Sequence, residues 1–461
     1  MSIVADHRPV GREERSCFSI PNIRLFIAFR ILFNARFYYP VFTVLFLDYG
    51  LTIEQFALLN AVWAVSIVSA EIPSGAMADL IGRRRLLVLT ALLMIAEMSL
   101  LAFVPLANST VVFWAFLINR ILSGLAEAMA SGADEAIAYD SLLEDGNPDH
   151  WPRVLSVLMR LQALAGVVAM TIGALVYDPD LINRLLSWLA IDQVVSQQVT
   201  MRFPIYLTLL LAIGAFFATI GLQERSNGET VSLATIRKAF LLTMQAGRWI
   251  LHTPFALAVI LFGMFYDHLL RLIITLASQY FRLIQLPEAS FGMIMASFSL
   301  LGLLVPKCAE WLVERFSPAA NCGLLGLLTL ATLWGLSGFF PYLGVLPMAG
   351  VMIGLLLTSF FTSHYLNRAT ASARRATVLS FKGLLFNLAY GLIGVFFALL
   401  ISHVRNGLLL DKPLLSPELL ENEAFRQSFS WFPWYGLALG LLLAAISYRL
   451  LHARSSPTDE T

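Results

Sequence analysis

The side chains with the clearest chemical potential are ionisable groups set inside apolar stretches. Segment 254–282 carries Asp267, His268 and Arg271 close together near its middle. A charge at the centre of a bilayer costs about 2.5–3.5 kcal/mol on insertion scales, so such groups face protein or water and indicate a functional site. A histidine can also exchange protons near neutral pH. Two simpler readings stay open: Asp267 and Arg271, four residues apart, pair within the helix, and His268 is only hydrogen-bonded.

A second group of polar side chains follows one face of segment 111–140. They recur at helical spacings of three and four residues, and they are Arg120, Gly124, Glu127, Ser131 and Asp134. Such a stripe forms either a salt-bridge seam against the neighbouring segments or one wall of a cavity. We place Arg120 and Glu127 in the cavity. Asp134 and Arg160 fall at similar depths, so we predict a structural pair between them.

Segment 21–47 adds two arginines. Arg30 lies near the depth of Glu71, and we predict that these two residues form a structural pair. Arg36 is closer to the midplane, one turn before Pro40, which can kink the helix. Because polar sites in membrane proteins built from repeats lie at midplane positions of corresponding helices, we predict that Arg36 is a cavity residue.

Arg36 and Asp267 carry opposite charges and occupy corresponding places in the two halves of the chain. We therefore predict that they face each other and help to form a substrate site. The competing scheme pairs Asp267 with Arg271 and leaves Arg36 to Glu127.

The elements that hold these side chains are membrane helices. The chain has 461 residues, of which 58% are hydrophobic and 13% charged, whereas soluble domains carry about 25% charged residues. A net charge of +1 argues against a nucleic-acid partner. The three cysteines lack metal-ligand or disulfide spacing, and we expect no metal and no cofactor.

About 20 apolar residues cross a bilayer, and this length predicts an all-α protein with twelve spans. They lie near 21–47, 54–80, 85–105, 111–140, 152–177, 203–222, 254–282, 289–315, 320–340, 344–366, 375–402 and 432–451. The predicted organisation is a tail (1–20), a six-helix bundle (21–222), a central loop (223–253), a second six-helix bundle (254–451) and a tail (452–461). Long gaps after the fifth and eleventh spans, near 178–202 and 403–430, indicate a duplicated unit.

The distribution of arginine and lysine predicts the orientation. The side that carries Arg83 is about three times richer in these residues than the opposite side, which by the positive-inside rule places both termini in the cytoplasm. Residues 1–20 hold no apolar core of a signal peptide. We expect a multi-pass protein of the plasma membrane, in bacterial terms the inner membrane, acting as a monomer in the lipid bilayer.

The stretch between the second and third spans, Gly75 to Arg85, reads G-x-x-x-D-x-x-G-R-R. This pattern resembles the signature loop of the major facilitator superfamily, whose fold of two six-helix bundles it therefore implies. By the same resemblance, a conformational latch falls on Gly75, Asp79, Gly82, Arg83 and Arg84. The second copy, Pro306 to Arg315, lacks both glycines. Arg120 followed by Gly124 is similar to a pattern that the family associates with proton coupling.

The resemblance implies a secondary transporter that works by alternating access. Because no phosphate-binding loop is present, we expect a gradient of protons or another ion to drive it. The mixed-sign charges predict a polar, zwitterionic or weakly charged organic solute. Import and efflux stay equally open, since the antiporter signature G-P-x-x-G-G is missing. One alternative is a lipid or lysolipid facilitator of the same fold. An integral-membrane enzyme is disfavoured, because neither H-E-x-x-H nor G-x-S-x-G occurs.

Overall fold

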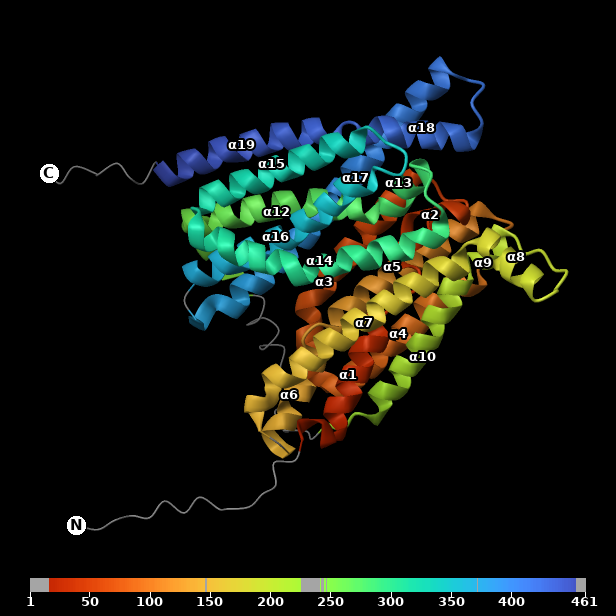
Figure 1. The fold of residues 1–461 in the computed structure, drawn as a ribbon. Coiled ribbons are helices and arrows are strands. Elements are labelled where there is room, and N and C mark those ends of the chain that lie inside the picture. The colour runs from red at the N-terminus through yellow and green to blue at the C-terminus, as the bar shows by residue number, and fades with distance from the viewer. Residues whose placement is uncertain are drawn as a thin grey trace, which may run out of the picture.

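The computed structural model describes residues 16–452 except 146, 225–240, 242, 243, 246 and 371, and the described part is helical without strands. Twelve stretches are long and apolar enough to cross a membrane, as the sequence predicts. The predicted tail up to residue 15 and most of the predicted central loop lie outside the described residues. Figure 1 shows the helices gathered into two groups that diverge from one corner of the molecule.

The first group comprises the described residues from 16 to 221. Its elements are α1 (Pro21–Asn34), η2 (Tyr39–Val41), α2 (Phe42–Asp48), α3 (Ile53–Ile81), α4 (Arg83–Phe103), α5 (Ser109–Ala130), α6 (Ala133–Asp145), α7 (Trp151–Tyr177), α8 (Pro179–Trp188), α9 (Gln197–Thr200) and α10 (Phe203–Gly221). We call this group the first bundle.

The second group begins at residue 254. Its elements are α12 (Pro254–Thr275), α13 (Ala277–Leu283), α14 (Glu288–Arg315), α15 (Pro318–Ser337), α16 (Val345–Ala369), α17 (Ser372–Asp411), α18 (Pro417–Phe429) and α19 (Phe432–His452). We call this group the second bundle.

Three predicted spans are divided. The first breaks between Asn34 and Phe42, around Pro40, and the seventh breaks at Leu276. The fourth breaks at Ser131 and Gly132, where Gly132 has a φ of 81°, a conformation that favours glycine. Broken membrane helices are tolerated where protein or water satisfies the freed backbone groups. The spans predicted over 21–47, 254–282 and 111–140 are therefore present but interrupted. A kink was expected only near Pro40, and the breaks at Leu276 and Gly132 were not predicted.

The bundles meet along two helix pairs, α3 with α17 and α7 with α14. At α7 and α14 the backbones touch, since a Cβ on Gly292 would lie 2.0 Å from the carbonyl oxygen of Met170. On α7 itself, a Cβ on Gly173 would lie 1.7 Å from the carbonyl oxygen of Phe37. Small residues at helix interfaces permit such approach within membranes. Glycine is therefore required at both positions.

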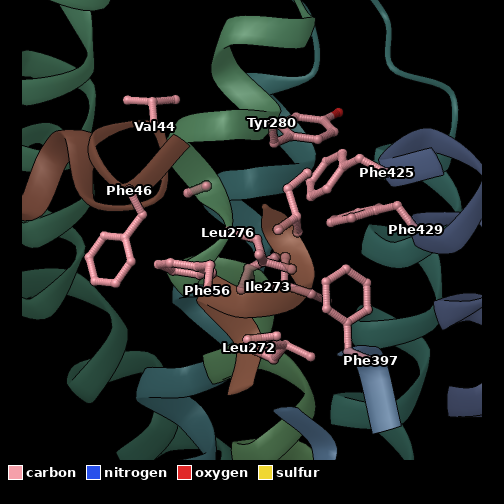
Figure 2. Close-up of a cluster of buried hydrophobic side chains, with 14 of the residues drawn as sticks. Val44, Phe46, Phe56, Leu272, Ile273, Leu276, Tyr280, Phe397, Phe425 and Phe429 are labelled. Atoms are coloured by element: carbon pink, nitrogen blue, oxygen red, sulfur yellow. The ribbon is translucent and has the colours of Figure 1, made fainter. Parts of the chain in front are cut away.

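One end of the molecule carries most of this joining. α2, α8, α13 and α18 are all at this end, which we call the junction end; the opposite end, where α1 begins and α19 ends, is the terminal end. An apolar cluster fills the junction (Figure 2). It joins Phe46 and Phe56 of the first bundle to Leu276, Phe397 and Phe429 of the second. Phe46 and Phe56 meet edge to face with their ring centres 4.9 Å apart.

Candidate functional site

Arg271 of α12 is the centre of a polar cluster on the second bundle. Its Nη2 lies 2.6 Å from Asp267 Oδ2, and its Nη1 donates to Asn387 Oδ1 of α17 at 2.9 Å. The guanidinium also covers the ring of Tyr390, 5.2 Å from its centre. The cluster is partly open, with 28% of the Arg271 side chain exposed. It presents a cation, an anion and an amide together.

Two further groups extend this cluster. Lys382 of α17 is a charged neighbour of both Asp267 and Arg271. Tyr390 faces Trp63 of α3, with ring centres 6.3 Å apart, so the cluster reaches the first bundle. Lys382, Asn387 and Tyr390 were missed by the sequence reasoning. The signal was the presence of three polar side chains inside a long apolar span.

The predicted Arg36–Asp267 pair is not formed. Asp267 is paired within its own helix, and Arg36 Nη1 lies 2.8 Å from Glu97 Oε1 of α4. Both side chains of that pair are buried, and Asn119 Nδ2 donates to the Glu97 carbonyl oxygen at 3.0 Å. The competing Asp267–Arg271 scheme is the one observed, although Arg36 goes to Glu97 and not to Glu127. The signal for Glu97 was its position as the single acidic residue of segment 85–105.

Arg120 is held by aromatic rings. It is buried, donates from Nε to Asn119 Oδ1 at 3.2 Å, and lies over the rings of Phe42 and Phe46. Four residues on, a Cβ on Gly124 would lie 2.6 Å from Ser66 Cβ and 2.8 Å from the Trp63 carbonyl oxygen. Gly124 is thus explained by the close packing of α5 against α3, independently of any coupling role.

Glu127 and Tyr39 are two exposed polar groups near the buried charges of the first bundle. Glu127 has Arg36, Glu97 and Arg30 as charged neighbours. Tyr39 in turn has Glu127 and Arg120 as neighbours. Glu127 thus sits beside the buried Arg36–Glu97 pair with its own carboxylate accessible.

The two predicted structural pairs were wrong in their partners. Arg30 joins Asp134 at 3.2 Å and Glu135 at 3.1 Å, both in the first turn of α6. The break after α5 lets α6 turn toward α1, which a continuous helix would not allow. Within the described part of the chain, Glu71 forms no ion pair, and neither does Arg160, which is exposed on α7.

His268 lies inside the second bundle. Its Nδ1 is 2.7 Å from the carbonyl oxygen of Met264, and its Nε2 is 2.8 Å from Tyr435 Oη of α19. The side chain is buried. It therefore follows the simpler reading of a hydrogen-bonded histidine, and the predicted cavity position is not observed.

The signature stretch after the second span is mostly helix. α3 continues through Gly75 and Asp79 to Ile81, and Gly82, with a φ of 91°, makes the turn into α4. The side chain of Asp79 lies outside the described part. Glu224, which follows α10, accepts from the backbone nitrogens of Arg83 and Arg84 at 2.8 and 3.0 Å.

The arginine side chains of this stretch also stay in the first bundle. Arg83 pairs with Asp140 of α6, and Arg84 Nη2 donates to the Ile220 carbonyl oxygen at 2.8 Å. A Cβ on Gly82 would lie 2.7 Å from Glu224 Oε2, which adds a steric reason for glycine there. The polar contacts named here for the stretch are therefore with helices of its own bundle and with Glu224, just after α10.

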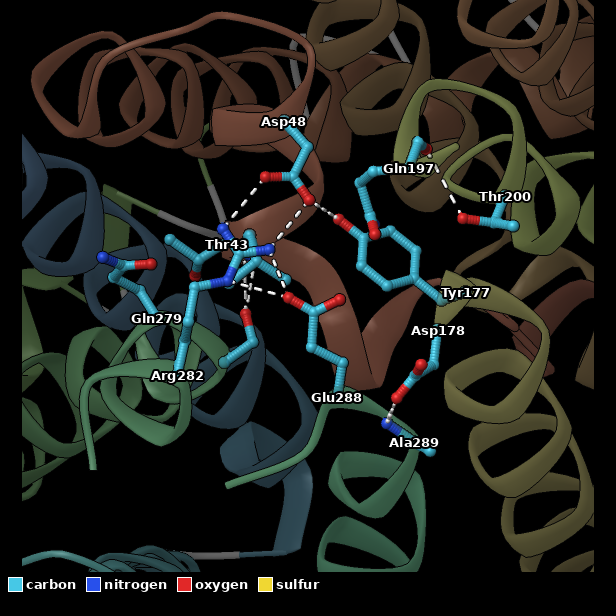
Figure 3. A network of polar contacts seen from close by, with 12 residues as sticks. Thr43, Asp48, Tyr177, Asp178, Gln197, Thr200, Gln279, Arg282, Glu288 and Ala289 are labelled. Atoms are coloured by element: carbon cyan, nitrogen blue, oxygen red, sulfur yellow. Dashed lines mark hydrogen bonds and ion pairs between the residues drawn. The ribbon is translucent and has the colours of Figure 1, made fainter. Parts of the chain in front are cut away.

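Charged clamps join the bundles at the junction end (Figure 3). Arg282 of α13 donates to both oxygens of Asp48, at 2.9 and 2.8 Å, and to Glu288 Oε1 at 2.5 Å. Tyr177 Oη also donates to Asp48. Beside them, the Ala289 nitrogen donates to Asp178 Oδ2 at 3.0 Å, so a first-bundle carboxylate caps α14.

A second clamp has the same construction. Arg405 of α17 lies 2.9 Å from Glu54 Oε2 of α3 and 2.7 Å from Glu421 Oε1 of α18. In each clamp one second-bundle arginine joins a first-bundle carboxylate to a second-bundle carboxylate. Asp48 and Glu54 flank the short connection between α2 and α3.

The helix breaks supply further contacts between the bundles. The backbone nitrogens of Thr43 and Val44 donate to Ser278 Oγ at 2.9 and 3.2 Å, and Thr43 Oγ1 donates to the Thr275 carbonyl oxygen at 2.5 Å. The first and seventh spans therefore meet where each is interrupted. Groups freed by a broken helix are satisfied here by the opposite bundle.

These features define a class: a multi-pass membrane protein of two helical bundles, with polar groups where broken spans meet. The chain matches the Major Facilitator Superfamily over residues 25–394 and belongs to that family. No protein with a curated description matches it.

Solved structures share the fold at low sequence identity. A bacterial homologue of the human lysosomal transporter Spinster, in an inward-facing and unoccupied conformation, aligns with a TM-score of 0.70 and 15% identity, covering 96% of this chain and 100% of that one. The nucleoside transporter NupG aligns at 0.68 and 11%, covering 92% and 98%. A D-xylose–proton symporter aligns at 0.66 and 13%, covering 94% and 98%.

Proposed function

We propose that this protein is a secondary transporter of a small polar or zwitterionic solute that works by alternating access. The observation that carries the proposal is the Arg271–Asp267–Asn387 cluster, which offers opposite charges and an amide at the interface of the two bundles. Charges inside a membrane span are costly, so their presence indicates a functional site. A zwitterion would match them, with its anion at Arg271 and its cation near Asp267.

The conformation proposed is one closed at the junction end. Charged clamps and the apolar cluster join the bundles there, and Glu127 and Tyr39 are exposed deeper in the molecule. The similarity to the inward-facing Spinster homologue supports this. In the orientation that the arginine and lysine distribution predicts, the terminal end faces the cytoplasm, and the solute would enter and leave there in this state.

An ion gradient is proposed as the energy source, and its direction of use is left to experiment. Glu127 is the proposed proton-carrying group, because it is exposed beside the buried Arg36–Glu97 pair. Asp79, Arg83 and Arg84 are proposed to latch one conformation, as the resemblance implies, and we assign to them the state in which the terminal end is closed.

The experiment has two stages. Untargeted metabolite profiling of a deletion strain would first identify solutes that accumulate or disappear, and these would be tested for uptake into proteoliposomes under an imposed pH gradient. Asp267→Asn and Arg271→Gln should each lower transport by at least about tenfold, because each removes one pole of the site at a cost of 1.4 kcal/mol or more.

Arg160→Gln is the matched control, since it removes an exposed arginine that forms no ion pair in the described part of the chain. It should transport normally. Normal transport by both Asp267→Asn and Arg271→Gln would contradict the assigned site. Transport unaffected by any ion gradient would contradict the coupling.

A further inference from the structure

A second site lies inside the second bundle, away from the interface with the first. It is a cavity of about 620 Å³ between α12, α15, α16 and α19. Its walls are mainly apolar side chains and glycines, and they include Phe262, Leu325, Gly326, Phe361, Leu437 and Gly440. Neither Arg271 nor Asp267 lines it. Its chemistry is therefore that of a hydrocarbon site.

The cavity opens toward the side of the molecule that faces lipid. Leu327 of α15 and Leu441 of α19 line it and are also 68% and 64% exposed. In a membrane span, exposed leucines contact lipid tails. Gly323 and Ala444 lie on the same two helices and are exposed as well, so small residues leave the mouth wide.

The length of the cavity fits one lipid leaflet. Its lining runs from Pro318 to Leu330 on α15 and from Tyr448 to Gly436 on α19, about 18 Å along each helix at 1.5 Å per residue. The hydrocarbon core of a bilayer is about 30 Å thick, so each leaflet contributes about 15 Å. Pro318 and Tyr448 both lie toward the terminal end of their helices.

Two buried hydroxyls line the cavity without a hydrogen-bond partner in the described part of the chain, Thr329 Oγ1 and Ser447 Oγ, and Ser447 is the one at the terminal end, where the head of a ligand would lie. The Ser447 side chain is nine-tenths buried. An unpaired buried hydroxyl costs about 1–3 kcal/mol. An ester carbonyl at the top of an acyl chain would accept its proton. Arg449, two positions on from this serine, is exposed where a phosphate head group would lie.

We propose that this cavity binds one acyl chain of a bilayer phospholipid from the leaflet at the terminal end, with its ester at Ser447. An apolar space open to lipid tails fills with hydrocarbon, because water gains no hydrogen bonds there. The bound acyl chain would pack against α12 beside Tyr266, the residue before Asp267. Tyr266 Oη donates to the Cys322 carbonyl oxygen at 2.9 Å. The site is separate from the solute site and does not depend on it.

The test is photolabelling in proteoliposomes with a phosphatidylcholine that carries a diazirine along one acyl chain. Labelled peptides should come preferentially from α15 and α19, at residues that line the cavity. The double variant Gly323→Phe with Gly440→Leu should reduce that labelling at least about fivefold. A Cβ at Gly323 meets nothing within 4 Å, and one at Gly440 lies at ordinary contact distance, 3.6 Å, from Phe265. Both substitutions therefore add bulk at positions that line the cavity without a backbone clash.

Gly302→Phe on α14 is the matched control, because a Cβ there also meets nothing within 4 Å and the residue does not line the cavity. It should label as the unmodified protein does, and Ser447→Ala should lower labelling about twofold. Equal melting temperatures would show that the variants are folded. Even labelling over all lipid-facing helices, or unchanged labelling in the filled variant, would overturn the proposal. The proposal would also be overturned if trace lysophospholipid abolished the labelling and the protein then transported that lysophospholipid across the bilayer. The occupant of the cavity would in that case be a transported substrate.

Discussion

The junction end and the middle of the molecule use arginine in opposite ways. At the junction end, Arg282 and Arg405 reach across from the second bundle to carboxylates of the first. In the middle, Arg36 and Arg271 take partners from their own bundle. Pairs that cross the interface must break when the bundles move apart, whereas pairs within a bundle can persist. The two regions therefore separate the charges that select a conformation from those that hold each bundle together.

Burial separates the Arg36–Glu97 pair from the clamps, whereas Arg271, with 28% of its side chain exposed, is about as open as Arg282. Arg36 and Glu97 are 4% and 0% exposed, whereas Arg282 is 30% exposed. Removing one partner of a buried pair costs about 3–5 kcal/mol, but exposed pairs contribute about 0.2–1 kcal/mol each. A junction held by partly exposed clamps can open at moderate cost. Rigid bundles that rock about such a junction are what alternating access requires.

Glu97→Ala should have the largest effect on stability and would test whether the buried Arg36–Glu97 pair holds the first bundle together. It leaves Arg36 as an unpaired buried charge, at a cost of about 3–5 kcal/mol. We expect low yield and a strongly reduced melting temperature in detergent, measured by fluorescence-detected size exclusion.

The control for this variant replaces both partners. Arg36→Met with Glu97→Leu removes the two charges together and should recover most of the lost thermal stability, because apolar replacements of buried pairs are often neutral. If the double variant were as unstable as Glu97→Ala, the pair would act through something other than charge burial.

The sequence predicted the spans well but not the pairing of their charges. Apolar length and the loop pattern determine where helices lie, and these signals are local. Partners depend on how helices rotate and break: Arg30 reaches Asp134 only because the chain turns at Gly132. Depth estimates along straight helices cannot supply that rotation. The Asp267–Arg271 pair was foreseen as an alternative because i, i+4 spacing is itself local.

Gly292→Leu should have the next largest effect, on the junction alone. A Cβ there would overlap the Met170 carbonyl oxygen of α7, so the closed junction must part or distort, at about 1–3 kcal/mol. Spin labels at Ser187→Cys and Lys412→Cys, both exposed near the junction end, would report the separation. We expect a longer mean distance. Gly302→Leu, lower on the same helix and unobstructed, should leave the distance unchanged.

Arg282→Met should shift the same distance distribution by less. The variant loses the hydrogen bonds of Arg282 to both oxygens of Asp48 and its contact with Glu288 Oε1. We take their joint contribution to the closed state as about 1.4 kcal/mol, which corresponds to a tenfold change in the ratio of closed to open molecules. Arg405→Met removes the companion clamp and should act in the same direction. High salt should mimic either variant in part, since partly exposed pairs are screened. Unchanged distances in both variants would show that the apolar cluster alone closes the junction.

Glu224→Ala should have the smallest effect and would separate stability from conformation. Glu224 accepts from the first two backbone nitrogens of α4 and so caps that helix with a negative charge. Losing a cap costs about 1 kcal/mol. Because its described contacts lie within the first bundle, the melting temperature should fall slightly while the distance between the two labels stays constant. A changed distance would mean that the turn at Gly82 is energetically coupled to the junction. The latch proposed for Asp79 and Arg83 would then act through the helix ends of the first bundle, without direct contact with the second.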